Sequence, residues 1–386
     1  MQNRIPDSEF QLRIKNIQEE LNRRDLDALI VHSNEAEFAN VRYLSDYWPV
    51  FESAGVVVPR EGEAILLIGP ESETFAHDRS RIKRITKVLQ YRESAQPEYP
   101  GVQMSTFKEV FSEASQGKGI KRLGISGYPI MPISVYDAIR NALQDSEIIW
   151  VDDLPSKMRM IKSPNEISML REAYRISAKA IDAAFDALRP GMTELQAVGI
   201  AEKVMYENGA EYEGHPQYVL SGRSSAHAIS RPSHKKLKKG ELVQLNIGAR
   251  VAGYSSSIGR PVCLGGVSTK MRKLVEFGLE AHRATGSFMK EGVQAKEVAK
   301  KFYEFAKNAG YGNYLLYGPC HGIGLIEVEP PWVELTSEYA LSENMTFQID
   351  TFLAGAGFGL RWEDGARVTK KGIEEFSAAE RILEKN

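Results

Sequence analysis

The chain has 386 residues, a formal net charge of −2, 42% hydrophobic and 26% charged residues, and two cysteines, Cys263 and Cys320. The near-neutral charge argues against a nucleic-acid-binding protein, which would usually carry a basic excess, and two cysteines exclude a disulfide framework. No window approaches about 18 apolar residues, and the polar N-terminus lacks an apolar signal core. We therefore expect a protein of the cytoplasm that binds neither nucleic acid nor a membrane.

The first half of the chain alternates helical and strand patterns. Residues 9–26 have apolar residues at helical spacing, and "DALIVHS" at 27–33 is typical of a buried strand. The segment 54–69 predicts a β-hairpin that turns at Pro59 and Gly62. Two further strands, "RLGISG" and "EIIWVDD", flank a helix in "PISVYDAIRNALQ". This order predicts an α/β domain that ends near residue 153.

Three helices and several long strands follow. Ser163 with Glu166 and Thr193 with Gln196 form two capping boxes, each of which marks a helix start. A third helix fits "GVQAKEVAKKFYEFAKNAGY". Strand patterns cover 216–221, 241–265, 345–353 and 358–369. Helices grouped on one side of an antiparallel sheet make an α+β domain, so we expect a smaller domain at 1–157 and a larger one at 158–386.

Seven segments carry a resemblance to a known family. They are "MRMIKSPNEISMLREA", "RPGMTE", "SGRSSAHAISRPSHKKLKKGE", "VQLNIGARVAGYSSSIGRP", "GPCHGIGL", "MTFQID" and "LRWEDGARVT", in this order from residue 158 to 369. Together they resemble the pita-bread superfamily of creatinase, prolidase, aminopeptidase P and methionine aminopeptidase. The resemblance implies a pita-bread C-terminal domain preceded by a creatinase-like N-terminal domain.

The resemblance also implies a set of metal ligands, of which this chain has only part. The metal-binding members hold two divalent ions with two aspartates, a histidine and two acidic residues. Those positions correspond here to Asn246, Ser257, His321, Asp350 and Glu363. Asparagine and serine offer neutral oxygens and cannot offset the charge of two cations. We therefore expect the dinuclear metal site to be lost.

Two histidine positions of the family are also changed. Its second active-site histidine corresponds to Val328, and its substrate-facing histidine corresponds to Ile229. His227 lies two residues before Ile229, and alternate residues of a strand share a face. His227 can therefore serve in its place, although a loop histidine with no such role fits equally well.

Structural roles compete with catalytic ones for the acidic residues. Asp350 lies among apolar residues, so its carboxylate belongs either to a site or to an ion pair, for which Arg361 is a candidate. Glu363 has Arg361 two residues before it and Arg367 four after, so a salt-bridged strand face is a rival interpretation.

Three hypotheses about function follow. The first is a creatinase-like, metal-independent hydrolase or lyase without a cofactor, which acts on the C–N bond of a small amidino, ureido or amide substrate. In it, His321, His227, Asp350 and Glu363 transfer protons. The second is a single-metal hydrolase of the Xaa-Pro aminopeptidase or prolidase type, with a metal at His321, Asp350 and Glu363. The third is a non-catalytic protein that binds a ligand or peptide. We favour the first.

Substrate contacts are expected from polar and aromatic residues near these positions. Ser257, Asn246, Arg361 and Trp332 are the candidates, although core packing competes for the aromatic residue. The resemblance further implies a homodimer, in which aromatic residues at 43–51 can reach the active site of the other subunit.

Overall fold

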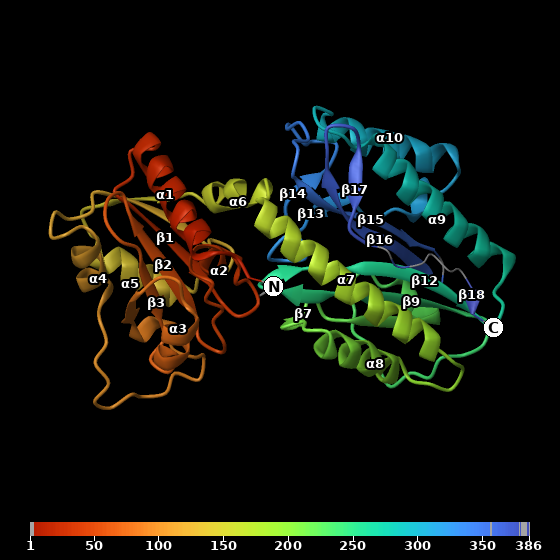
Figure 1. Ribbon diagram of the computed structural model, residues 1–386, viewed down its shortest axis with the longest axis horizontal. Coiled ribbons are helices and arrows are strands. Elements are labelled where there is room, and N and C mark those ends of the chain that lie inside the picture. The colour runs from red at the N-terminus through yellow and green to blue at the C-terminus, as the bar shows by residue number, and fades with distance from the viewer. Residues whose placement is uncertain (1–3, 356, 378, 380–383, 386) are drawn as a thin grey trace. The chain divides into compact units, whose positions relative to one another are not determined.

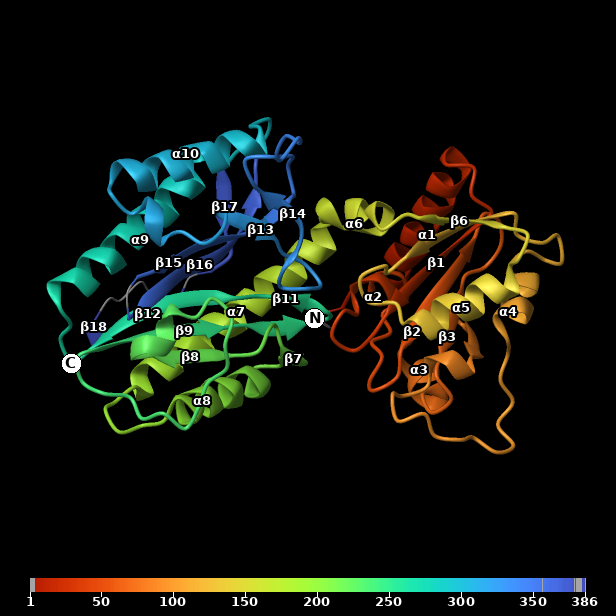
Figure 2. The same ribbon diagram turned by 180° about the vertical axis from the view of Figure 1, so that it is seen from behind.

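The computed structural model describes residues 4–355, 357–377, 379 and 384–385. It divides into two compact units, residues 5–159 and a second unit made mainly of residues 160–386. Each is an α/β assembly around its own sheet (Figures 1 and 2). The two-domain pita-bread fold expected from the sequence is confirmed.

The N-terminal unit is built on a mixed sheet with the strand order β4-β3-β2-β1-β5-β6. Its strands are β1 (Ala28–Ser33), β2 (Ala54–Pro59), β3 (Ile65–Ile68), β4 (Arg84–Lys87), β5 (Arg122–Ser126) and β6 (Glu147–Trp150). The predicted hairpin at 54–69 is present as the antiparallel pair β2–β3, whereas β1 and β5 are parallel. Alternation along β1 decides its packing: Ala28 and Ile30 join the apolar core formed with α4 and α5.

The N-terminal unit also contains helices. They are α1 (Asp7–Arg23), α2 (Ala39–Ser45), α3 (Glu73–Arg79), α4 (Phe107–Ala114), α5 (Ile133–Ala142) and α6 (Asp153–Met160), with a short 3-10 helix η1 (Leu89–Tyr91). Helix α1 buries Phe10, Ile17 and Leu21, the apolar spacing that predicted it. A capping box of Thr106 and Glu109 begins α4.

The C-terminal unit contains a nine-stranded sheet with the path β14-β13-β15-β16-β12-β9-β8, to which β17 and β18 add. Its strands are β8 (Tyr218–Ser221), β9 (Glu241–Ile247), β12 (Ile258–Leu264), β13 (Cys320–Gly322), β14 (Glu329–Val333), β15 (Thr346–Ala354), β16 (Gly359–Val368), β17 (Ile373–Glu375) and β18 (Glu384–Lys385). A small sheet holds β7 (Tyr212–Glu213), β10 (Ala249–Val251) and β11 (Tyr254–Ser255). Pairing along the path is antiparallel.

Two pairs of helices cover this unit (Figures 1 and 2). They are α7 (Pro164–Ala187) with α8 (Glu194–Glu207), and α9 (Thr269–Phe288) with α10 (Ala295–Asn308); the short 3-10 helices are η2 (Gly222–Ala226) and η3 (Gly312–Tyr314). The capping boxes at Ser163 and Thr193 are both formed. Helix α9, which begins after Ser268, was not predicted, and neither were the short strands β13 and β14.

Candidate active site

The candidate residues lie on neighbouring strands of the nine-stranded sheet. In the antiparallel register, Asp350 of β15 lies opposite Glu363 of β16, and Gly259 of β12 lies opposite both Glu363 and Asn246. Residues opposite one another point to the same face of a sheet. The topology therefore gathers side chains from positions more than a hundred residues apart.

Gly259 permits the close approach of the two strands on either side of it. A Cβ atom at this position would lie 2.7 Å from Cβ of Glu363 and 3.0 Å from Nδ2 of Asn246. Contacts below about 3 Å force a shift of the neighbouring atoms. The glycine thus lets Asn246 reach across β12 to Glu363.

Asn246 and Ser257 both donate hydrogen bonds to one oxygen of Glu363. Nδ2 of Asn246 donates to Oε2, and the Ser257 hydroxyl donates to the same atom at 2.8 Å. All three residues are buried. The two donors hold Oε2 of Glu363 in place, and its Oε1 lies outside these two hydrogen bonds.

Gln244 fixes the orientation of the Asn246 amide. Its Nε2 donates to Oδ1 of Asn246 at 2.8 Å and to the carbonyl of Arg361 at 2.9 Å, while its Oε1 accepts from the Arg361 N–H at 2.7 Å. Because the Asn246 oxygen already accepts, its NH₂ group must face Glu363. Asn246, at the position where the resemblance implies an aspartate, is therefore a hydrogen-bond donor here.

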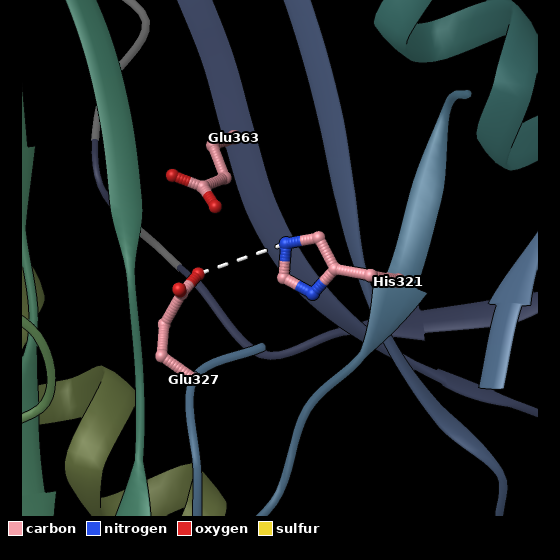
Figure 3. A group of neighbouring side chains, drawn as sticks. All are labelled: His321, Glu327 and Glu363. Atoms are coloured by element: carbon pink, nitrogen blue, oxygen red, sulfur yellow. Dashed lines mark ion pairs between the residues drawn. The ribbon is translucent and has the colours of Figure 1, made fainter. Parts of the chain in front are cut away.

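A histidine and two carboxylates meet at the other oxygen of Glu363 (Figure 3). Ligand atoms of His321, Glu327 and Glu363 lie within 4.8 Å of one another. His321 Nε2 is 3.7 Å from Oε1 of Glu327, and its Nδ1 lies 3.0 Å from the Gly322 carbonyl. Donation from Nδ1 to this carbonyl leaves the Nε2 lone pair directed at the carboxylates.

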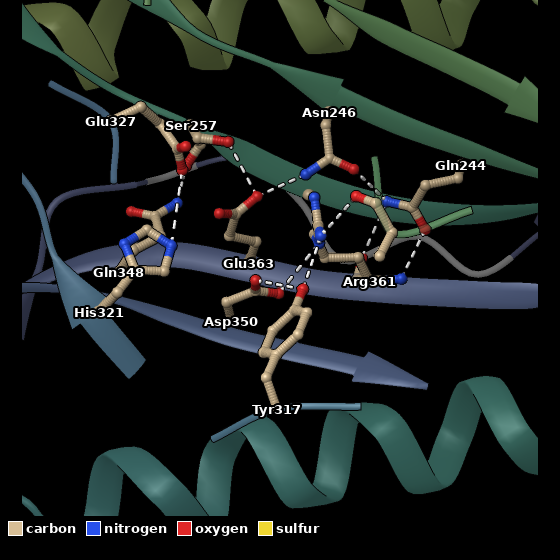
Figure 4. Close-up of polar contacts among 12 residues, drawn as sticks. Gln244, Asn246, Ser257, Tyr317, His321, Glu327, Gln348, Asp350, Arg361 and Glu363 are labelled. Carbon is tan, nitrogen blue, oxygen red and sulfur yellow. Dashed lines mark hydrogen bonds and ion pairs between the residues drawn. The ribbon is translucent and has the colours of Figure 1, made fainter. Parts of the chain in front are cut away.

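Asp350 belongs to a second group, with Arg361 and Tyr317 (Figure 4). Nε of Arg361 lies 3.1 Å from Oδ1 of Asp350, and the Tyr317 hydroxyl donates to Oδ2 at 2.7 Å. Arg361 also donates to the Tyr317 oxygen at 2.6 Å and to the Ala228 carbonyl at 3.0 Å. The ion pair suggested by the sequence for Asp350 is thus present. Among the residues that the structure describes, Glu363 forms no ion pair with an arginine or lysine, and Arg367 pairs instead with Glu374.

Burial and neighbouring charges shift the pKa values of both groups. Burial raises the pKa of Glu327 well above its usual range, and repulsion by Glu363 adds to the effect. Burial also raises the pKa of Asp350, while the guanidinium of Arg361 opposes that rise. The pKa of Tyr317 is raised by burial and by Asp350. The site is therefore a low-dielectric environment in which unpaired charge is unfavourable.

A buried ion pair braces the segment that carries Glu327. Nζ of Lys162 lies 2.9 Å from Oε1 of Glu329, and both side chains are 2% exposed. Glu329 follows Glu327 by two residues and begins β14. The pair ties the end of the 323–329 segment to the start of the C-terminal unit.

The structure gives the remaining predicted residues peripheral positions. His227 is exposed in the loop after η2, where its Nδ1 lies 3.2 Å from the Ser230 hydroxyl. Its neighbour Ala228 contacts Arg361, so this loop borders the site. Trp332 lies opposite His321 on β14, and their rings are 5.2 Å apart.

Three residues of the site were not predicted from the sequence: Gln244, Tyr317 and Glu327. Glu327 directly precedes Val328, the position that corresponds to the family's second histidine. An acidic residue next to an expected ligand position was the available signal. Glu327 was missed because only the residue at the expected ligand position, Val328, was considered.

The fold and the site define a class of protein: a two-domain scaffold in which two strands and the segment between β13 and β14 bring a histidine and two carboxylates into ligand positions. Residues 168–370 match metallopeptidase family M24, and residues 13–161 match the creatinase/prolidase N-terminal domain. The chain belongs to metallopeptidase family M24, a family of hydrolases.

Similar proteins are known from archaea. An Xaa-Pro dipeptidase of Pyrococcus horikoshii is 30% identical over 374 residues, which cover 96% of this chain and 98% of the relative. An Xaa-Pro dipeptidase of Pyrococcus furiosus is 28% identical and covers 90% of this chain and 93% of its own. The solved structure of the prolidase from Pyrococcus horikoshii superposes with a TM-score of 0.83 at 28% identity, covering 96% and 99% of the two chains.

These relationships correct the first functional hypothesis. The prediction of a creatinase-like, metal-independent enzyme is wrong, because the family is one of metallopeptidases and the relatives are Xaa-Pro dipeptidases. That hypothesis gave most weight to the neutral side chains of Asn246 and Ser257. Glu327 supplies a carboxylate beside His321 and Glu363 that it omitted. The prolidase-type alternative agrees better with the relatives.

Among the residues that the structure describes, no helix is long and apolar enough to cross a membrane.

Proposed function

We propose that the chain is a metal-dependent hydrolase of the Xaa-Pro dipeptidase type, with one divalent cation held by His321, Glu327 and Glu363. The convergence of these three side chains carries the proposal. One imidazole and two carboxylates are a common ligand set for a first-row divalent ion, and two carboxylates balance its charge.

A second ion does not fit the same surroundings. Asn246 and Ser257 contribute no negative charge, and both donate to Glu363. Asp350 is held by Arg361 and Tyr317. We therefore propose that this centre has one ion where the metal-binding relatives of the resemblance have two.

The residues of the chain have separable tasks in this proposal. A bound cation supplies Lewis acidity toward the carbonyl of the scissile amide. Asn246 and Ser257 hold Glu363 in one orientation, and the Gly322 carbonyl does so for His321. The rings of Trp332 and Tyr317, whose centroids are 6.2 Å apart, offer an apolar surface beside His321. A proline ring is a flat apolar group that suits such a surface.

The substrate class follows from the relatives: a small dipeptide with proline in the second position. We also propose that the chain acts as a homodimer in the cytoplasm. Light scattering of the purified full chain measures the oligomeric state, and a mass of one chain contradicts the dimer.

Hydrolysis of dipeptides tests the proposal. The untagged full chain is stripped with chelator, reloaded with Mn²⁺, Co²⁺ or Zn²⁺, and assayed on Xaa-Pro dipeptides and on matched dipeptides without proline. We expect turnover of Xaa-Pro substrates only after reloading, and its loss in His321→Ala and Glu327→Gln. The matched control is His234→Ala, which removes an exposed histidine.

Turnover of the chelated protein at the reloaded rate contradicts the proposal. Bound metal without turnover of any dipeptide contradicts it too, and favours the non-catalytic binding protein.

A further inference from the structure

Asp350 lies on the strand next to that of Glu363 but has different partners from the three ligand residues. It is directly opposite Glu363 in the register of β15 and β16, and it is 4% exposed. It nevertheless lies outside the group of ligand atoms formed by His321, Glu327 and Glu363. Proximity alone would make it a metal ligand, as the sequence suggested.

The contacts of Asp350 explain its separation. One oxygen lies 3.1 Å from Nε of Arg361, and the other accepts the Tyr317 hydroxyl at 2.7 Å. Nε of Arg361 and Oδ1 of Asp350 do not form a hydrogen bond with each other. Electrostatic attraction between the two charged groups therefore holds this pair together. Both carboxylate oxygens are therefore engaged away from the cluster.

Arg361 is itself fixed from several sides. Its backbone N–H and C=O are both bound by the Gln244 side chain, and its guanidinium donates to Tyr317 and to the Ala228 carbonyl. Its guanidinium also lies 5.3 Å from the ring of Phe352. A guanidinium held in this way cannot leave Asp350 without breaking its hydrogen bonds to Tyr317 and Ala228.

The charges of the site balance only when this pair is counted as a unit. In the cation-bound state, with the carboxylates ionised, Asp350, Glu327 and Glu363 carry three negative charges, and Arg361 carries one positive charge. The neighbouring Asp364 belongs to a separate buried pair with Arg260, whose Nη2 lies 2.7 Å from its Oδ1. With His321 neutral, as a ligand must be, a net charge of two remains for a cation to neutralise.

We infer that Asp350 is not a metal ligand but the counterion of Arg361, and that this pair limits the centre to one divalent cation. The inference rests on the proposed function, since it assumes that a cation binds at His321, Glu327 and Glu363. It assigns Asp350 and Arg361 a positioning role, in which they set the charge around the cation without touching it.

Cation binding by one single variant and one double variant of the pair tests the inference. The affinity and stoichiometry of Mn²⁺ are measured by calorimetry, and bound metal by elemental analysis, on the full-length wild-type chain and on Asp350→Asn, Arg361→Met/Asp350→Asn and Glu363→Gln. These readouts are independent of turnover. Circular dichroism checks that each variant is folded.

The expected results separate a counterion from a ligand. Asp350→Asn leaves one site but weakens binding about tenfold, because the unpaired Arg361 charge then repels the cation. The double variant returns to within about threefold of the wild type, since removing both charges restores the balance. Glu363→Gln loses binding by at least about a hundredfold, as expected for a ligand.

Two outcomes distinguish failure of the inference from failure of the proposed function. If the wild type binds one ion but Asp350→Asn and the double variant both lose binding as completely as Glu363→Gln, Asp350 is a ligand and only the inference is overturned. If the wild-type chain binds no ion, the proposed function fails, and the inference with it. The double variant keeps the test valid if Asp350→Asn alone does not fold.

Discussion

Acid should destabilise the N-terminal unit through a buried histidine, His32. It lies on β1 opposite Gly55, is fully buried, and has its ring 5.5 Å from that of Tyr91. Burial lowers its pKa from 6.5 to about 4. The unfolded chain therefore binds a proton that the folded chain resists, and stability falls as the pH drops from 6.5 toward 4.

The size of the effect follows from the two pKa values. Between about pH 7.5 and about pH 5, a histidine shifted from 6.5 to about 4 costs the folded state about 2 kcal/mol. A variant with a leucine at this position, His32→Leu, has no proton to bind and escapes this cost. Its stability at neutral pH will differ for reasons of packing, so the comparison concerns the change with pH.

Urea unfolding of the full chain at both pH values measures the difference. We expect the wild type to lose about 2 kcal/mol more than His32→Leu in the transition of the N-terminal unit. The control is His77→Leu, which removes an exposed histidine of α3 and should behave as the wild type. Equal losses in the wild type and in His32→Leu would refute the reasoning.

Three further predictions concern the C-terminal unit. Lys162→Met removes the ammonium group that pairs with the buried Glu329 carboxylate and should cost about 3–5 kcal/mol in thermal unfolding. The double variant Lys162→Met/Glu329→Leu should cost much less, and equal losses would contradict this. Gly259→Ala places a Cβ atom against Glu363 and Asn246 and should weaken cation binding about tenfold or more. The control Gly199→Ala on α8, with open space around the added Cβ atom, should leave the affinity unchanged. Equal affinities of the two variants would show that β12 shifts to accommodate the added atom. Glu194→Ala removes a buried carboxylate that accepts hydrogen bonds from Ser221, Ser224 and Ser233. Amide hydrogen exchange across residues 221–233 should therefore become faster. Unchanged exchange would mean that other contacts hold the loop.

Local features of the fold were predictable because their causes lie within a few residues. The capping boxes at Ser163 and Thr193 determine where α7 and α8 begin. The hairpin at 54–69 follows from a short turn between two apolar runs. Strands β13 and β14 were missed because both are short, and because β13 is also held by the later strand β15.

The site was only partly predictable for the same reason. Asn246, Ser257, His321, Asp350 and Glu363 could be named from motifs, yet their partners are set by strand register. Nothing near Asp350 in the sequence indicates Tyr317, which is 33 residues away in the chain. Glu327 comes close to Glu363 only because the sheet places β13 next to β15 and β15 next to β16, and Glu327 lies in the segment after β13. Pairings of this kind depend on the assembled sheet.

The most direct test of the single-cation centre is an anomalous diffraction experiment on crystals of the full chain grown with Mn²⁺. The account predicts one anomalous peak, at bonding distance from Nε2 of His321 and from the carboxylates of Glu327 and Glu363, with Asp350 still paired to Arg361. Two peaks, one of them bonded to Asp350, or no peak at this position, would contradict it.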